Sequence, residues 1–200
     1  MIYKRYVKHV LDLLAALTAM PFVCLIILLF APVIYLEDRG TVFYKAKRRG
    51  LNGKVFGMYK LRSMKMNAPD LRNEDNSTFN SSSDPRVTRI GGFLRKTSID
   101  ELPQIFNIIK GDMSVIGPRA PIPIEGHKWE DLSEEKRKRL SVRPGISGYS
   151  QAKFRNSISM EEKLKWDCYY VDHVSFMLDL KIIVWTIKSV VLQKNIHSNE

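Results

Sequence analysis

Cysteine is nearly absent from this chain: Cys24 and Cys168 are the only two among 200 residues. They lie far apart and match no metal-ligand spacing, which argues against a disulfide framework and against a zinc site. The chain also shows no internal repeat and no boundary that would indicate a second soluble domain. Its length suits one compact domain that is large enough to bury its own core.

Acidic residues are also scarce relative to basic ones. The chain has 32 Lys and Arg against 21 Asp and Glu, which gives a net charge of +11 and a pI near 9.7. Nucleic acid, an anionic bilayer and phosphorylated ligands could each account for this excess. Aromatic residues are not interleaved with the basic ones as on a surface that binds single strands, and we therefore expect no nucleic-acid partner.

One long segment, from Leu13 to Leu36, has no charged side chain. As a continuous helix it would rise about 36 Å, enough for a hydrocarbon core of about 30 Å. No small-residue cleavage site follows it, which argues against a cleaved signal peptide. Basic residues lie on both sides, so the positive-inside tendency would keep both ends in the cytoplasm. They are Lys4, Arg5 and Lys8 before the segment and Arg39, Lys45, Lys47, Arg48 and Arg49 after it.

Pro21 lies inside this segment, where it removes one helical hydrogen bond and clashes with the preceding turn. Thr18, about one turn earlier, could satisfy a carbonyl group that is freed there. We predict a re-entrant helix that enters the membrane, breaks at Met20-Pro21 and returns to the same face. A kinked helix that crosses the bilayer is the alternative.

The predicted organisation is a membrane element at residues 1–36 and one globular domain at residues 37–200. Val42–Tyr44 and Val55–Tyr59 read as two strands of a hairpin, with a turn signal between them. The polar stretch Asn67–Arg86 is expected to be a mobile loop. The predicted fold class is α+β, mostly helical with a small β-hairpin.

Helical patterns occupy residues 89–113 and 130–140 and the last part of the chain, whereas residues 142–156 read as a loop. The final helix carries an apolar stripe that is expected to pack on the core or to lie in the membrane interface. The stripe comprises Phe176, Leu180, Ile183, Val184, Ile187 and Val191.

Two neighbouring carboxylates, Asp100 and Glu101, are the strongest candidates for chemistry. Side by side they can bind a divalent metal and leave one oxygen free to attack. A purely structural role is also open, because Ser98 to Glu101 matches a capping box and Pro103 is typical of a helix start.

Arginines surround this pair in the sequence. Arg95 lies about one turn upstream, and Arg119, Arg143 and Arg155 each lie in a loop with Gly or Pro. A guanidinium group matches phosphate oxygens in pairs, so several such loops predict a phosphate-binding site. Ordinary solvated arginines are the alternative.

Three segments then match one family in order: KTSIDELPQIFNIIKGDMSVIGPRAP, VRPGISGYSQAKFRN and SFMLDLKI. They closely resemble the small monotopic phosphoglycosyl transferases. These bacterial membrane enzymes move a phospho-sugar from a nucleotide diphosphate sugar to a polyprenol phosphate. The resemblance covers nearly the whole chain, from HVLD near the N-terminus through the final helix.

The resemblance implies a covalent mechanism in two steps. Asp100 would attack the β-phosphate of a UDP-sugar and release UMP, and polyprenol phosphate (undecaprenyl phosphate) would then take the phospho-sugar from Asp100. Mg²⁺ would bind Asp100 and Glu101, with Glu101 positioning the metal or transferring a proton. Arg95, Arg119 and Arg155 would bind phosphate.

Lys60 and Arg62 are expected near the site or near the headgroup of the acceptor. A solvated basic strand face beside anionic lipid is the alternative for both. The resemblance places the protein in the bacterial cytoplasmic (inner) membrane, with the catalytic domain on the cytoplasmic face, at the start of surface glycoconjugate synthesis. Whether it forms a homo-oligomer is left open.

One feature departs from the family. A Ser-Pro step usually breaks the re-entrant helix, whereas Met20-Pro21 stands here, about one helical turn closer to Asp12 than is typical. Two other functions remain to be weighed. One is a basic, membrane-anchored binding protein without catalysis, and the other is a transferase that passes the phospho-sugar directly, without a covalent intermediate.

Overall fold

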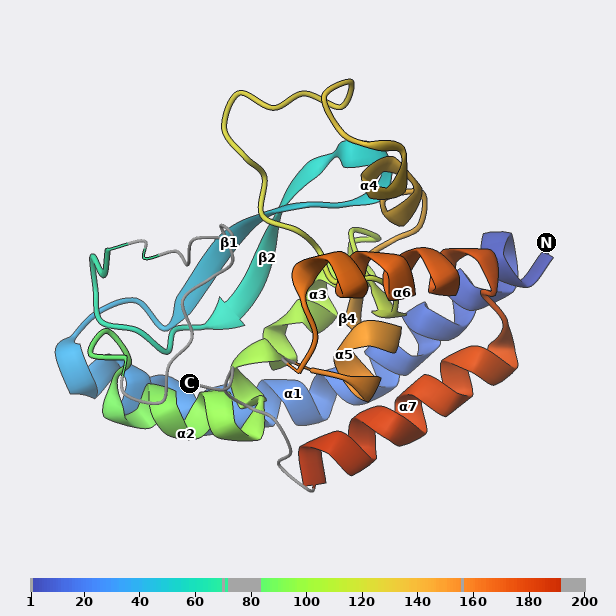
Figure 1. Ribbon diagram of the computed structural model, residues 1–200. Helices are drawn as coiled ribbons and strands as arrows, with labels where there is room; N and C mark the ends of the chain where they lie inside the picture. The colour runs from blue at the N-terminus through green and yellow to red at the C-terminus, as the bar shows by residue number, and fades with distance from the viewer. Residues whose placement is uncertain (1, 70, 72–83, 156, 192–200) are drawn as a thin grey trace.

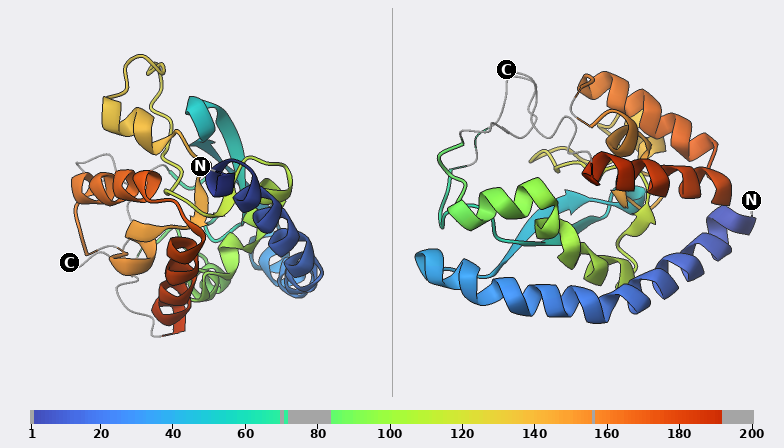
Figure 2. Two further views of the ribbon diagram at one scale, coloured as in Figure 1. Left: turned by 90° about the vertical axis from the view of Figure 1, so that its right-hand side faces the viewer. Right: turned by 90° about the horizontal axis from the view of Figure 1, so that it is seen from below.

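A single long helix opens the fold. The computed structural model describes residues 2–69, 71, 84–155 and 157–191. A π-helical turn, η1 (Tyr3–Val7), leads into α1 (Lys8–Asp38), which is curved and follows one side of the molecule (Figures 1 and 2). The two together are long and apolar enough to cross a membrane, and only 11% of their most apolar 18-residue window is buried.

The predicted helix break at Met20-Pro21 is not present. Both Pro21 and Pro32 lie inside α1, and the helix continues past each of them to Asp38. Proline has a backbone φ that fits a helix, so the lost hydrogen bond and the clash with the preceding turn can be met by bending rather than by ending the helix.

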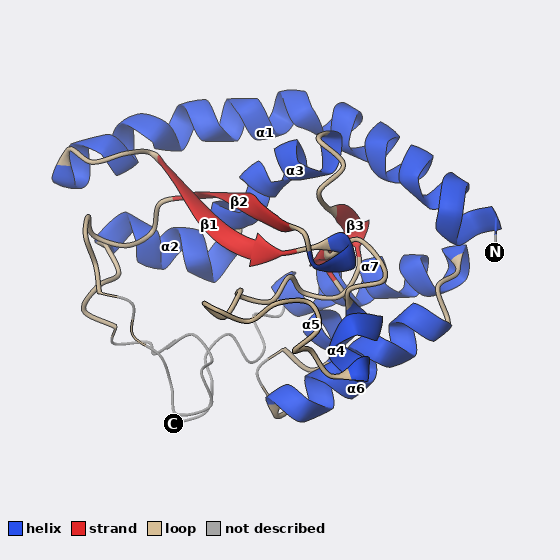
Figure 3. Ribbon diagram, turned by 90° about the horizontal axis from the view of Figure 1, so that it is seen from above, coloured by secondary structure: helices blue, strands red, loops and turns tan. Residues whose placement is uncertain are grey.

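The predicted β-hairpin is confirmed. Strands β1 (Phe43–Arg49) and β2 (Val55–Leu61) pair antiparallel along their whole length. The turn between them holds a short 3-10 helix, η2 (Leu51–Gly53), in which Asn52 and Gly53 have φ of 52° and 80°. Asparagine and glycine are the residues that tolerate this left-handed conformation best. The hairpin lies over α1 and the helices that follow (Figures 1 and 3).

The helical region predicted at residues 89–113 is three successive helices. They are α2 (Arg89–Thr97), the 3-10 helix η3 (Ile99–Gln104) and α3 (Ile105–Ile109). Ser98 separates the first two, because its backbone is left-handed, with a φ of 60°. The chain therefore turns sharply between α2 and η3, immediately before the two carboxylates.

The loop predicted at residues 142–156 contains regular structure, which is a correction. Strand β4 (Gly145–Ser147) pairs in parallel with β3 (Ser114–Ile116), and α5 (Tyr149–Lys153) follows. The two strands approach closely, since a Cβ atom on Gly145 would collide with the backbone nitrogen of Gly117. Strands of three residues have no readable alternation, so only the tertiary pairing reveals them.

The remaining helices are α4 (Glu134–Arg139), α6 (Met160–Asp172) and α7 (Phe176–Val191). The fold is thus mostly helical with two small sheets, in agreement with the predicted α+β class. The apolar stripe of α7 does not pack on the core, because its described members are all exposed. These are Phe176, Leu180, Ile183, Val184 and Ile187.

Three apolar clusters hold the elements together. The largest joins α1, the hairpin and α3, and includes Ala16, Phe56 and Ile108. A second joins β3 to α5, α6 and α7, and a third joins the end of α1 to β2 and α2 through Ile34, Leu61 and Leu94.

The expected mobile loop, Asn67–Arg86, lies largely outside the described residues, which omit 70 and 72–83. Its base is described. The backbone N–H of Lys65 donates to the carbonyl of Arg86 at 2.8 Å.

Candidate active site

The two carboxylates stand on the tight turn of η3. Ser98 ends α2 in a left-handed conformation, and its side chain makes no capping hydrogen bond to η3. An N-cap residue needs an extended backbone, so the capping box weighed for Ser98 and Glu101 does not form. Asp100 and Glu101 are therefore free of that structural role. Asp100 is 7% exposed.

Lys60 reaches both carboxylates from β2. Its Nζ atom lies 2.5 Å from Glu101 Oε1 and 4.0 Å from Asp100 Oδ2. The Lys60 side chain is itself largely buried, so little water screens this charge. Lys60 thus lies beside the acidic pair, and its role in binding substrate or phosphate stays a prediction.

Arg119 and Arg95 approach the pair from two other elements. Arg119 Nη2 lies 3.9 Å from Glu101 Oε1, with about half of its side chain exposed. Arg95 projects from α2, and its Nε donates to Ser63 Oγ at 3.0 Å. Gly91 allows this approach, because a Cβ atom there would collide with the carbonyl oxygen of Ser63. Burial lowers the pKa of Arg95, and the charge of Asp100 opposes that effect.

The two carboxyl groups have different acidities. Burial raises the pKa of Asp100 to about 6, although Lys60 opposes this rise. Burial also disfavours ionisation of Glu101, but the positive charges of Lys60 and Arg119 outweigh it and hold its pKa at about 2. Glu101 is thus an anion at all ordinary pH values, and Asp100 becomes one just below neutrality.

Arg62 is not part of this group. Its guanidinium forms an ion pair with both carboxylate oxygens of Asp38 and donates to the backbone carbonyls of Ile34, Thr41 and Met64. All three of its nitrogen atoms are engaged in fastening the end of α1 to β2. Arg62 was expected to bind phosphate or the acceptor headgroup. Its guanidinium pairs with the carboxylate of Asp38 instead.

Arg155 and Arg143 come from other elements. Arg155 follows α5 with a left-handed φ of 51°, and burial lowers its pKa. None of the contacts described above joins Arg155 to the acidic pair. The phosphate-binding role of Arg155 stays a prediction. Arg143 Nε donates to the carbonyl of Gly111 at 2.9 Å and so holds the chain before β3.

Two residues near the site were not predicted from the sequence. Arg48, on β1, adds a positive charge that lowers the pKa of Glu101. Asn107, fully buried in α3, donates to the carbonyl of Gly57 at 2.8 Å and accepts from the N–H of Tyr59 at 2.9 Å. Asn107 thus forms hydrogen bonds with the backbone of β2 beside Lys60. Its position in an apolar helical run was the available signal, since a buried polar side chain needs partners.

The acidic pair also determines which kind of metal site the described residues could form. Within the described parts of the chain, no three His, Cys, Asp or Glu side chains converge on one point. A protein cage for a metal is therefore not built from those residues. Two adjacent carboxylates do fit Mg²⁺, because this ion takes few protein ligands when phosphate oxygens and water complete its shell.

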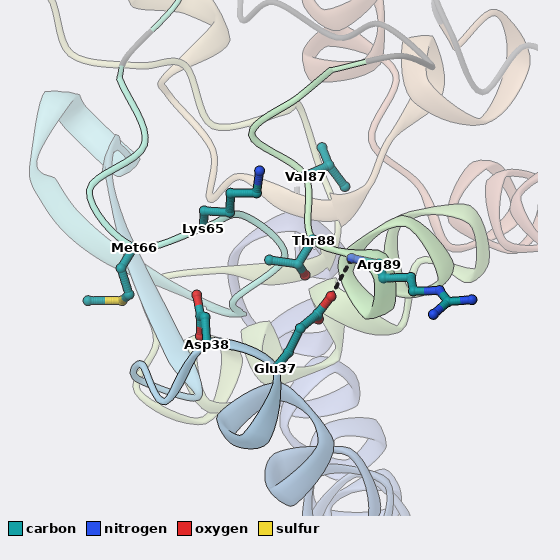
Figure 4. A pocket seen from close by; sticks show the side chains of 7 residues that line it. All are labelled: Glu37, Asp38, Lys65, Met66, Val87, Thr88 and Arg89. Carbon is teal, nitrogen blue, oxygen red and sulfur yellow. Dashed lines mark hydrogen bonds between the residues drawn. The ribbon is translucent and has the colours of Figure 1, made fainter.

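A shallow hollow lies elsewhere, at the C-terminal end of α1 (Figure 4). There Glu37 accepts from the backbone N–H of Arg89 at 2.6 Å and so caps α2. The hollow mixes acidic and basic side chains, and it does not include the acidic pair. Its lining consists of Glu37, Asp38, Lys65, Met66, Val87, Thr88 and Arg89.

Known proteins resemble this chain over almost its whole length. A family model described as "Bacterial sugar transferase" matches residues 3–193. The chain is 40% identical over 190 residues to the uncharacterized sugar transferase EpsL of Bacillus subtilis (strain 168), covering 94% of this chain and 89% of EpsL.

Two further relatives are longer. The galactosyl transferase CpsE of Streptococcus agalactiae serotype III is 38% identical over 193 residues, which cover 92% of this chain and 42% of CpsE. The UDP-glucose:undecaprenyl-phosphate glucose-1-phosphate transferase of Xanthomonas campestris pv. campestris is 35% identical over 192 residues, which cover 94% of this chain and 39% of that protein. The chain thus spans less than half the length of both.

The family model covers every described helix and strand, including η3, and the loop that holds Arg119. EpsL adds a relative that the match covers over 89% of its length. The resemblance predicted from the ordered motifs is confirmed: the chain belongs to the bacterial sugar transferase family.

Proposed function

We propose that this protein transfers a phospho-sugar from a UDP-sugar to a polyprenol phosphate at a membrane surface, giving polyprenyl diphosphate-sugar and UMP. The observation that carries the proposal is the pair formed by the buried Asp100 and the half-buried Glu101, close to Lys60, Arg95 and Arg119 in a bacterial sugar transferase. The name of the Xanthomonas relative, which specifies UDP-glucose and undecaprenyl phosphate, supports the substrate class.

Asp100 is the proposed nucleophile. One of its carboxylate oxygens forms a bond to the β-phosphorus of the UDP-sugar, the bond from that phosphorus to the bridging oxygen breaks, and UMP leaves with the electron pair. A phosphate oxygen of the polyprenol phosphate then attacks the same phosphorus, and the bond to Asp100 breaks. The carboxylate is regenerated, so no oxidant or further reactant is required. Its pKa of about 6 leaves Asp100 ionised at neutral pH.

The cations supply the activation that a carboxylate lacks. A carboxylate is a modest nucleophile, so the phosphorus must be made more electrophilic by neutralising its oxygens. Lys60 is largely buried beside the pair, Arg95 lies close enough for Asp100 to act on its pKa, and the half-exposed Arg119 can follow an entering diphosphate. Arg155 is proposed as a further phosphate ligand.

Asp100 and Glu101 are also the proposed holders of Mg²⁺. When bound, the ion would neutralise charge on the diphosphate. Glu101 is suited to this task because it remains ionised, with its pKa held at about 2. Lys60 now occupies one oxygen of Glu101, so Lys60 and the metal would share that carboxylate.

The fastening of α1 supports attachment to one face of the bilayer. At its N-terminal end, Lys8 contacts Asp179 at 2.8 Å and Asp12 accepts from Ser114 at 2.6 Å. At its C-terminal end, Asp38 pairs with Arg62. A helix of 31 residues is about 46 Å long, so a crossing helix would separate its ends by more than the hydrocarbon core. Both ends of α1 are instead tied to one globular domain.

This arrangement suits the substrates. A polyprenol phosphate keeps its tail in the bilayer and its charged head at the surface, and charge buried deeper costs several kcal/mol. We place the protein on the cytoplasmic face of the bacterial inner membrane, where anionic lipids and both anionic substrates meet its net charge of +11.

The test is the first half-reaction. We expect Asp100→Asn to abolish UMP release from UDP-sugars, because the amide cannot form the phosphoryl bond. Glu161→Gln, an exposed acid on α6, is the matched control and should retain full activity. A panel of UDP-sugars assayed with polyprenol phosphate would also identify the sugar.

Trapping the intermediate separates the alternatives. Mass spectrometry of protein quenched after mixing with UDP-sugar alone should show a phospho-sugar on Asp100. Turnover without that adduct, with Asp100→Asn still active, would indicate direct transfer. Absence of UMP release with every UDP-sugar would favour a binding protein without catalysis.

A further inference from the structure

Arg119 reaches the acidic pair from a segment without regular secondary structure. This segment comprises residues 118–124, and the Arg119 side chain is about half exposed. Its Nη2 atom lies 3.9 Å from Glu101 Oε1, a contact too long and too exposed to fix an arginine side chain by itself. The place of the Arg119 guanidinium therefore depends on how the backbone of the segment is held.

Two hydrogen bonds hold that backbone at Arg119. The N–H of Gly145, in β4, donates to the carbonyl of Pro118 at 3.0 Å. Arg139, the last residue of α4, donates from Nη2 to the carbonyl oxygen of Arg119 itself at 2.8 Å. A charged guanidinium makes a stronger hydrogen bond than a neutral amide, so Arg139 provides the stronger of the two supports.

Arg139 is in turn fixed by a buried carboxylate. Its Nε atom lies 2.8 Å from Oδ2 of Asp167 on α6, and the two side chains are 12% and 1% exposed. The other oxygen of Asp167, Oδ1, accepts from the hydroxyl of Ser150 on α5 at 2.7 Å. Burial raises the pKa of Asp167, and the charge of Arg139 is the largest influence that opposes the rise. Because little water reaches the ion pair, it is weakly screened and can hold Arg139 in one orientation.

A neighbouring ion pair offers a direct contrast. Lys138, one residue earlier in α4, pairs with Asp172 on α6 at 2.7 Å, and both of these side chains are nearly half exposed. The two ion pairs thus join the same two helices, which pack against each other (Figures 1 and 3). The Lys138 pair lies at the surface, whereas the Arg139 pair is buried and extends to the carbonyl of Arg119.

We infer that Arg139 is a positioning residue for the phosphate site: anchored on Asp167, it fixes the backbone of Arg119 so that the Arg119 guanidinium stays beside Glu101. The planar fork of an arginine suits this task, because one nitrogen faces the carboxylate while another donates to the carbonyl. The inference rests on the proposed role of Arg119 as a phosphate ligand.

The experiment measures UDP binding to the full-length protein by isothermal titration calorimetry with Mg²⁺ present, and the melting temperature of each variant. Arg119→Ala gives the effect of losing the guanidinium, and Arg139→Met removes the support of its backbone. Lys138→Met is the matched control, because it breaks the exposed ion pair between the same helices. A double variant, Arg139→Met with Asp167→Asn, leaves no unpaired charge buried and so separates stability from positioning.

We expect Arg119→Ala to weaken UDP binding by about tenfold and Arg139→Met by about three- to tenfold, while Lys138→Met binds as the native protein does. The double variant should regain much of the melting temperature that Arg139→Met loses, but its UDP binding should stay weak. In the Arg119→Ala background, Arg139→Met should cause little further loss of binding, because it acts through Arg119.

Recovery of UDP binding together with the melting temperature in the double variant would show a purely structural role and would overturn the inference. Native-like binding by Arg139→Met would also overturn it, as would the failure of both variants to fold. With Arg119→Ala still impaired, these results would leave the proposed function intact. Native-like binding by Arg119→Ala, or no UDP binding by the native protein, would overturn the inference together with the phosphate-binding role of Arg119.

Discussion

At the scale of single residues, two cations on one stretch of chain have different tasks. Lys60 and Arg62 are two residues apart, a spacing that puts side chains on the same face of a strand. Lys60 meets Glu101 on η3, whereas Arg62 meets Asp38 at the end of α1. The partner that each side chain reaches, and not its place in the sequence, decides whether it lies at the candidate site or fastens the end of α1.

Substitution of these two residues should separate the roles. Lys60→Met should lower the rate of UMP release by about 100-fold, because an activating charge is lost. Arg62→Met should lower stability by about 2 kcal/mol, since it leaves the partly exposed Asp38 without its ion pair. Thermal unfolding and initial rates measure both effects. A stable, inactive Arg62→Met protein would contradict the assignment.

A second buried ion pair should make stability depend on pH. Arg86 bonds to both carboxylate oxygens of Asp84, which holds the pKa of Asp84 below its ordinary value of 3.8. Because the folded pKa is the lower one, the stabilisation is complete above about pH 4 and is lost as pH falls through the folded pKa.

Asp84→Asn should therefore lower the melting temperature by several degrees at pH 7, and the difference from the native protein should shrink below pH 4. Asp131→Asn, at an exposed acid, is the control and should change little at either pH. A difference that stays constant from pH 7 to pH 3 would argue against the ion pair as its cause.

At the scale of elements, polar contacts decide how the helices are joined. Asp179 of α7 receives hydrogen bonds from Tyr3, Lys8 and Tyr170, and so ties α7 to the start of α1. Buried polar groups of this kind cost stability unless each partner is present, which makes the joint specific.

Asp179→Asn should loosen this joint. The amide keeps one acceptor but not the charge, so Lys8 loses its close ion-pair partner and stability should fall by about 2–3 kcal/mol. Hydrogen exchange should speed up in η1 and the first turns of α1, measured by mass spectrometry. Asp172→Asn, at an exposed ion pair near the end of α6, is the control. Equal exchange in the two variants would refute this account.

At the scale of the whole molecule, the domain holds both ends of α1 and leaves its apolar surface outward. On the proposed attachment, a bilayer would contact the protein from one side, whether or not the helix contains a break. One-sided attachment therefore depends on how the ends of α1 are fastened, and not on a break in the helix. The helix continues past Pro21, whereas the sequence predicts an interruption at Met20-Pro21.

Labelling from one side of the membrane tests this topology. In a background of Cys24→Ala and Cys168→Ser, Ile2→Cys and Lys47→Cys should both react with a membrane-impermeant maleimide in inverted inner-membrane vesicles, without detergent. Both native side chains are exposed, one on each side of the apolar helix. Labelling of only one position until detergent is added would show a helix that crosses the bilayer.

The sequence by itself determined the features that depend on local order. The uncharged run predicted a long apolar helix, two short strand-forming runs around an Asn-Gly turn predicted the hairpin, and adjacent acids with nearby arginines indicated the candidate site. Its limits are equally physical. The sequence around Ser98 fits both a capping box and a left-handed helix end, so it does not say which one forms. The strands β3 and β4 are only three residues long, too short for an alternating pattern to be recognised.

Only the tertiary structure decided which charges meet. Lys60 lies 41 residues from Glu101 in the chain, and Arg62 lies 24 residues from Asp38. Coulomb attraction between partners so far apart depends on how β2, η3 and α1 pack, which no local pattern encodes. The same packing turned the apolar face of α7 outward, because its other face already holds the core residue Ile182.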